Sequence, residues 1–267
     1  GLVMRASDDI RIALVGGDSV TWLGNHQGYT AGWSVVNDLL LENGFSRSGD
    51  IYLSNNFGSI VDVLDHGLVK LLANNIILEA SGSVGEYAEG GTIDAIEVAF
   101  NNPESGFIYA DADSGVVSLD AINGNLNVRA INAGSTAYLS ALLSVRDESE
   151  NTAVSALTRA ASWDNEYVVV DVKASDVIIT AGLDIGELTG DEASGFGANL
   201  DIDLAADGFL SVTADNIYLN EFIGDLKLRS VVVSEQAFIS AAAGGIYENA
   251  VVDGAASMML SGRVKLF

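Results

Sequence analysis

A five-residue pattern recurs along the chain: an apolar residue, a variable residue, a second apolar residue, a second variable residue and then a small residue, as in the segment Ile76–Ala80. The nine copies span 76–80, 117–121, 126–130, 170–174, 177–181, 202–206, 210–214, 226–230 and 237–241. Alternation of apolar residues predicts a short strand with one buried face. The small last residue suits a corner at which the chain bends over its own core.

Polar residues occupy most of the variable positions, among them Asp120, Asn127, Asp171 and Asp203. They predict that the second face of each strand contacts solvent. Gly, Asn and Asp lie between the copies and favour tight turns. The Asn pairs that begin at residues 55 and 74 are 19 residues apart, which indicates a coil of roughly 20 residues. About thirteen such coils, stacked at ~4.8 Å, would form a rod about 60 Å long.

Two all-β architectures are compatible with many short alternating strands. One is a right-handed parallel β-helix (β-solenoid) with short helical or loop insertions, the hand following the usual crossover rule. The other is an antiparallel β-sandwich. Every copy of the motif has the same orientation and ends in a small residue, as stacked coils require. The β-helix is therefore the favoured fold.

The repeat divides the chain into an irregular, capping or first-coil region over residues 1–48 and a β-helix shaft over 49–267. Val35, Val36, Leu39 and Leu40 have helical spacing and precede Asn43-Gly44, a typical helix end. Asp147, with Glu150 three residues later, resembles a helix start within an insertion near 145–165. The alternative for both segments is a loop extruded from a coil.

Composition excludes several classes of protein. The chain has 37 acidic and 12 basic residues, a net charge of −25 and no cysteine. Disulfide scaffolds and cysteine zinc sites are ruled out, and no basic stripe is available for nucleic acid. No apolar stretch approaches the ~18 residues of a membrane-spanning helix, so no such span is expected. The start at Gly1 and the apolar end predict a segment of a longer chain.

The segments 71–85, 201–220 and 224–246 resemble the repeats of filamentous-haemagglutinin-like proteins, which are giant bacterial surface proteins and adhesins. The resemblance covers roughly residues 50–85 and 107–250 and concerns a central shaft, because the secretion domain of such proteins has no counterpart in this sequence. It implies an extracellular location on the bacterial cell surface and a stalk or adhesin function. Its implied partners are adjacent coils or domains of a longer parent chain, and host or neighbour cell surfaces or glycans.

Carboxylate pairs are the strongest candidates for chemistry. Asp111 and Asp113 are two residues apart, as are Asp201 and Asp203, so each pair would lie on one side of a strand, about 7 Å apart. Such a pair can serve glycoside hydrolysis or ligate Ca²⁺. The closing Glu of a calcium loop is missing after Asp111. The alternative, which is favoured, is a solvated face on an acidic rod.

Histidine and tryptophan provide few further candidates. His26 and His66 have no nucleophile motif around them, so surface positions are expected for both. Trp22, Trp33 and Trp163 would form a sugar-stacking platform if exposed, although core positions are favoured.

The expected function is that of a non-catalytic structural or adhesive segment without a cofactor. Two alternatives stay open: a β-helical polysaccharide-degrading enzyme that uses the paired carboxylates, and a calcium-stabilised extracellular module.

Overall fold

The computed structural model describes most of the chain, in eleven ranges. These are residues 2–6, 10–14, 19–22, 30–32, 38–62, 67–87, 93–148, 170–187, 199–249, 258–260 and 263–266. Over these residues the structure contains strands and no helix.

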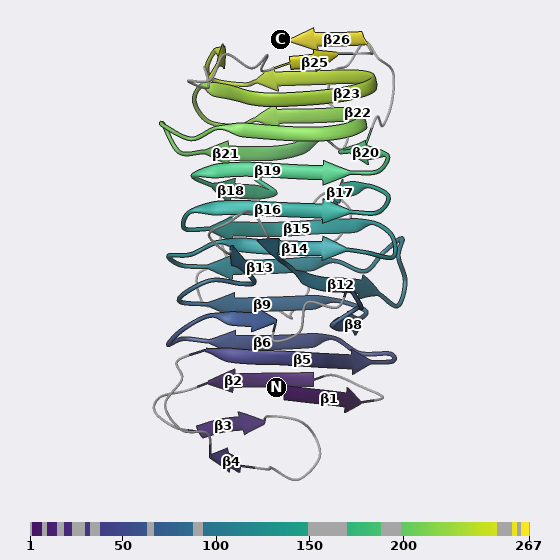
Figure 1. The fold of residues 1–267 in the computed structure, drawn as a ribbon, viewed down its shortest axis with the longest axis vertical. Helices are drawn as coiled ribbons and strands as arrows, with labels where there is room; N and C mark the ends of the chain where they lie inside the picture. The colour runs from purple at the N-terminus through teal and green to yellow at the C-terminus, as the bar shows by residue number, and fades with distance from the viewer. Residues whose placement is uncertain are drawn as a thin grey trace.

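Strands of successive coils pair in parallel, and Figure 1 shows them stacked along the long axis of the molecule. Twenty-four strands belong to one continuous hydrogen-bonded sheet. Among the described strands, antiparallel pairing is confined to β2–β3, β3–β4 and the hairpin β10–β11. The chain is therefore a parallel β-helix, and the antiparallel sandwich is wrong.

Each coil contributes strands to two sides of the helix. One side consists of ten strands that pair in succession: β2 (Ile10–Leu14), β6 (Ile51–Asn55), β9 (Ile76–Ala80), β13 (Ile108–Ala112), β15 (Leu126–Ala133), β18 (Val172–Ala174), β21 (Leu200–Leu204), β22 (Leu210–Glu221), β23 (Leu226–Ala241) and β26 (Arg263–Leu266). The second side contains β1 (Leu2–Ala6), β5 (Leu39–Ser46), β7 (Ile60–Asp62), β8 (Leu71–Ala73), β12 (Ile96–Phe100), β14 (Val117–Ala121), β16 (Thr136–Ala141), β19 (Asp176–Ala181), the first parts of β22 and β23, and β25 (Met258–Leu260). The remaining strands are β3 (Ser19–Trp22), β4 (Thr30–Gly32), β10 (Glu86–Tyr87), β11 (Ile93–Asp94), β17 (Val145–Asp147), β20 (Asp184–Ile185) and β24 (Ile246–Glu248).

The shortest coils have the predicted length. Leu126 pairs with Val145, 19 residues later, and Ala110 pairs with Ile131, 21 residues later. Other coils are longer because they contain insertions, so that Ile10 pairs with a residue 41 positions later. The estimate of thirteen coils is therefore too high. Ten stacked strands at ~4.8 Å give a shaft about 43 Å long.

A continuous apolar stack forms the core of this shaft. Ile51, Ile76 and Ile108 lie in register on successive coils, and each is fully buried. Six of the nine small last residues of the motif are also buried, Ala80 and Ala121 among them, whereas Ala206 is exposed and Ser230 and Ala241 are half-buried. Since burial of apolar surface contributes about 25 cal/mol per Å², this stack is the main stabilising term of the fold.

The helix expected to end at Asn43-Gly44 is wrong, because these residues belong to β5. Leu39 and Leu41 are buried on either side of the exposed Leu40, which is strand alternation. Parallel pairing with neighbouring coils outweighs the local helical spacing. Asp147, the expected helix start, ends strand β17, and the rest of that expected helix lies outside the described residues.

Candidate functional site

The pair Asp111 and Asp113 belongs to a polar cluster formed by four successive coils. The carboxylate of Asp111 accepts hydrogen bonds from Asn132 Nδ2 at 2.9 Å and from the Tyr109 hydroxyl at 3.3 Å. Glu79, on the preceding coil, lies in register with Asp111 and accepts a hydrogen bond from the hydroxyl of Tyr52. Burial raises the pKa of both half-buried carboxyl groups, whereas Asp113 is exposed beyond the strand end.

Glu79 is therefore the carboxylate that lies in register with Asp111 on the adjoining coil. The spacing of residues in the sequence does not reveal that these two residues are neighbours. Coulomb repulsion from Asp111 contributes to the raised pKa of Glu79 after the larger effect of burial. Tyr109 also has a raised pKa, first because it is buried and second because Asp111 lies next to it. The cluster combines two carboxyl groups with two phenols on one outer face of the shaft.

Asp201 and Asp203 do not act as a carboxylate pair. Asp201 Oδ1 accepts a hydrogen bond from Asn220 Nδ2 at 2.8 Å, and Asp203 Oδ2 lies 3.2 Å from Lys173 Nζ. Each carboxylate is thus bound to a different neighbouring coil. We conclude that this pair ties coils together and is not arranged as an acid and a base.

Insertions interrupt strands while the register continues on both sides of them. Val128 and Ile131, three positions apart, pair with Asp147 and Val172, which are 25 positions apart. Two such interruptions lie on adjacent coils. The first, at 148–171, separates β17 from β18, and the second, at 186–199, separates β20 from β21; β17 pairs with β20, and β18 pairs with β21. A second set, on the other side of the shaft, interrupts the coils at 63–70 and at the β10–β11 hairpin.

A buried triad of ionisable side chains lies at the second set of insertions. Lys70 Nζ is 3.0 Å from Asp62 Oδ2, and Glu97 is adjacent on the next coil. All three residues are at most 6% exposed. Burial raises the pKa of Glu97 to about 7; the charge of Asp62 raises it as well, and Lys70 lowers it. Glu97 is therefore the member of the triad whose charge changes near neutral pH.

A buried pair of carboxyl groups lies where the insertion at 148–171 leaves the shaft. Asp147 and Asp171 are 7% and 1% exposed, and the two carboxyl groups are close enough for each to affect the other's charge. Burial and then the charge of Asp147 raise the pKa of Asp171 well above its usual range. Asp171 Oδ2 also accepts the Asp201 N–H at 2.8 Å, while Oδ1 has no partner among the described residues.

Asp171 and Asn127, expected at solvent-facing positions, are buried instead. Asn127 Nδ2 donates to the carbonyl oxygens of Pro103 and Gly106 at 2.8 and 2.7 Å, so the segment between β12 and β13 covers it. Side chains that point outward from a strand contact solvent only where no other segment covers the sheet. The alternation of apolar and polar residues within one strand does not reveal such a cover, because the covering residues belong to another coil.

Several candidates cannot be located. His26, His66, Trp33 and Trp163 lie outside the described residues, and only the backbone of Trp22 is described, in β3. In the ranges that the structure describes, no group of three or more His, Cys, Asp or Glu side chains is placed to hold a metal ion.

The buried ionisable residues that sequence reasoning missed are Asp62, Lys70 and Glu97. The one available signal was Lys70, a cation between apolar Val69 and Leu71 in a chain with few cations. Lysine is rarely buried unless it is paired, so its position inside an apolar run indicates a buried carboxylate partner.

Comparison with known protein families, with curated proteins and with solved structures gave no match. No helix long and apolar enough for a membrane crossing occurs in the described part of the chain.

Proposed function

We propose that this chain is a non-catalytic shaft of a large secreted or cell-surface bacterial protein, which presents its insertions for contact with a cell or a surface. The parallel stack supplies rigidity, since each coil is hydrogen-bonded to the next along its length. The acidic surface keeps the shaft soluble and repels neighbouring shafts. Its insertions then supply the variable contact surface, as loops on regular scaffolds commonly do.

Continuity of the register across the insertions carries this proposal. Val128 and Ile131 are joined by two residues, and their partners Asp147 and Val172 pair equally well across a much longer connection. The core therefore does not depend on the length of the insertion. A scaffold built in this way tolerates exchange of the presented segment without loss of the fold.

The buried ionisable groups support the same function. Asp62 with Lys70, and Asp147 with Asp171, each bring together the two chain ends at which an insertion leaves and re-enters the shaft. Groups bound in this way fix the point of emergence. The insertion is thereby held at a constant place on the shaft, whatever its own conformation.

The test is a deletion that the register specifies. Removal of residues 149–170 leaves two residues between Asp147 and Val172, as in the uninterrupted coil below. We expect the variant to retain the β-sheet circular dichroism spectrum and to lose binding to a panel of bacterial and animal cells, measured by flow cytometry. A second deletion removes residues 64–69 from the opposite side of the shaft, which likewise leaves two residues between Asp62 and Leu71.

Cell binding that both deletions leave unchanged would contradict the proposal, as would unfolding of the 149–170 deletion. Loss of binding in one deletion with a retained fold in both would support it and would identify the presenting side.

Polysaccharide cleavage is the second candidate, and the half-buried carboxyl groups of Glu79 and Asp111, in register on adjacent coils of an outer face, favour it. Burial raises the pKa of both groups, and a carboxyl group with a raised pKa can donate the proton that glycoside cleavage requires. Turnover of neutral and acidic glycans that is abolished in Asp111→Asn would establish this function in place of the shaft. Absence of turnover across the panel would reject it.

A further inference from the structure

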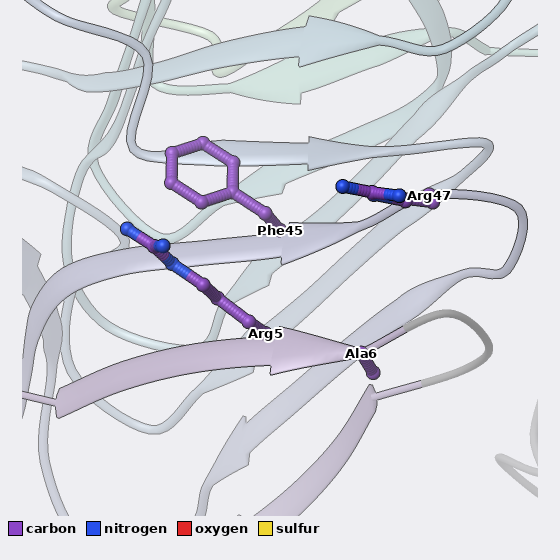
Figure 2. A pocket seen from close by; sticks show the side chains of 4 residues that line it. All are labelled: Arg5, Ala6, Phe45 and Arg47. Atoms are coloured by element: carbon purple, nitrogen blue, oxygen red, sulfur yellow. The ribbon is translucent and has the colours of Figure 1, made fainter.

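A pocket at the N-terminal part of the shaft combines two arginines with an aromatic ring. Arg5, Ala6, Phe45 and Arg47 line a cavity of about 560 Å³. Figure 2 shows Arg5 extending from β1 toward Phe45 on β5, with Arg47 just beyond the end of β5. Both arginine side chains are exposed and Phe45 is half-buried. The cavity is therefore open to a ligand from solvent.

The β-helix register builds this pocket. Arg5 lies directly opposite Phe45 in the parallel pair β1–β5, and the Arg47 N–H donates to the Ala6 carbonyl at 3.3 Å. Both arginines consequently project from the same end of two hydrogen-bonded strands. The pocket belongs to the regular coil and involves none of the insertions, so it does not depend on the function proposed above.

Arg5 and Arg47 are two guanidinium groups that line the same pocket. Of the other described cations, Lys70, Arg146, Lys173 and Lys227 are ion-paired, whereas Arg129, Arg229 and Lys265 lie over phenylalanine rings, as Arg5 lies over Phe45. No carboxylate of the described residues is paired with Arg5 or Arg47, although the chain has 37 acidic residues. Within the described part of the chain, two arginines that line one pocket thus have no carboxylate partner, and we infer that they can receive an external anion.

Arg5 is also less closely stacked than its counterparts. Its guanidinium carbon is 5.9 Å from the centroid of the Phe45 ring, compared with 4.6 Å for Arg129 over Phe107 and 4.4 Å for Arg229 over Phe209. The looser contact leaves the N–H fork of Arg5 free to turn toward a ligand. A guanidinium fork matches the two oxygens of a carboxylate.

We propose that this pocket binds a sugar that carries a single carboxylate, of the uronic acid class. The carboxylate would lie against the two guanidinium groups, and the apolar face of the sugar ring would pack against Phe45. The cavity volume falls within the range of small-ligand sites. A net charge of −25 repels polyanions such as acidic peptides most strongly, whereas a ligand with one charge on a neutral polyol is repelled least.

The test is a titration of the intact chain followed by NMR chemical shifts. D-Glucuronate should give saturable shifts, while D-glucose, which lacks the carboxylate, should give none. N-acetyl-L-alanine, a peptide-like compound with a single carboxylate, should bind at least about tenfold more weakly than D-glucuronate, because it has no ring to pack on Phe45. Arg5→Gln and Arg47→Gln should each weaken glucuronate binding at least about tenfold, as expected for loss of a charged hydrogen bond.

Arg229→Gln is the matched control, since it removes an exposed arginine from the same kind of arginine–phenylalanine contact without a second arginine nearby. Its affinity for glucuronate should equal that of the unmodified chain. Equal binding of glucose and glucuronate would overturn the proposal, as would unchanged affinity in both pocket variants. Equal binding of N-acetyl-L-alanine would overturn the assignment to a sugar.

Discussion

Glu221 gives the sharpest test of how this core tolerates charge. It lies on β22 in register with Ile202 on one side and Ala241 on the other, at a position that is otherwise apolar or small, and it is fully buried. Its Oε1 accepts the Leu204 N–H at 3.2 Å, and Oε2 has no partner among the described residues. Burial, followed by repulsion from Asp203, raises the pKa of Glu221 from 4.5 to about 8.

The raised pKa makes the stability depend on pH in a definite direction. Below pH 4.5 the side chain is protonated in both the folded and the unfolded state. Between pH 4.5 and about 8 the unfolded chain loses this proton while the folded chain retains it, so the free energy of unfolding falls as pH rises. The contribution lost is about 3 kcal/mol at pH 7 and about 5 kcal/mol at pH 9, relative to pH 4.

Glu221→Gln should remove this dependence. Glutamine keeps an oxygen for the Leu204 N–H and cannot ionise, so the variant should match the unmodified protein at pH 4. It should exceed it by about 3 kcal/mol at pH 7. Urea unfolding followed by circular dichroism at a series of pH values measures the difference, with exposed Glu235→Gln as the control. Parallel profiles, or a Glu221→Gln variant that is less stable at pH 7, would refute the assignment of a neutral, uncompensated Glu221.

Three further predictions use the same unfolding assay. Lys70→Met should lower the free energy of unfolding by about 3–5 kcal/mol, because it leaves the buried carboxylate partners of Lys70 without a compensating charge. Lys173→Met, which breaks the more exposed Lys173–Asp203 ion pair, should lower it by less than about 1 kcal/mol. Gly182→Ala should destabilise the protein by more than about 2 kcal/mol, since the added Cβ would lie 2.1 Å from a carbonyl oxygen of the preceding coil. Gly124→Ala places its Cβ with no atom within 4 Å, so its free energy of unfolding should differ from that of the unmodified protein by less than about 0.5 kcal/mol. Leu119→Ala, at a fully buried core position, should cost about 2–5 kcal/mol, and a smaller loss would mean that the stack relaxes around the cavity.

The fold was predictable because its determinants are local and repeated. The motif copies at 76–80 and 117–121 coincide with β9 and β14, and the coil length follows from strands and turns in one stretch of sequence. The number of coils was not predictable from length, because the size of an insertion leaves no trace in the motif. The error at Leu39–Gly44 has a similar cause, since pairing with other coils determined the conformation.

The candidate site was less predictable because lateral neighbours determine it. Asp111 was identified from its spacing to Asp113, yet its contacts are with Asn132 and Tyr109, and its carboxylate neighbour is Glu79, 32 residues earlier. Such neighbours become adjacent only when the register is known. A sequence with insertions of variable length does not supply the register.

Parallel stacking poses a particular problem for a chain with a charge of −25, because residues in register lie about 5 Å apart and like charges there repel. The structure places amides opposite carboxylates: Asn75 donates to Asp50 at 2.9 Å, Asn216 to Asp184 at 2.8 Å and Asn220 to Asp201 at 2.8 Å.

An amide can donate to one coil and accept from the next, so it extends the ladder without adding charge. Asn220 does both, since its Oδ1 accepts a hydrogen bond from Ser240 at 2.9 Å. Where two acids do face each other, as Asp147 and Asp171 do, burial and repulsion raise the pKa of Asp171, which favours its neutral form. Alternation of amide with carboxylate on the open faces, and raised pKa values of carboxyl groups buried where insertions leave the shaft, together allow an acidic chain to stack on itself.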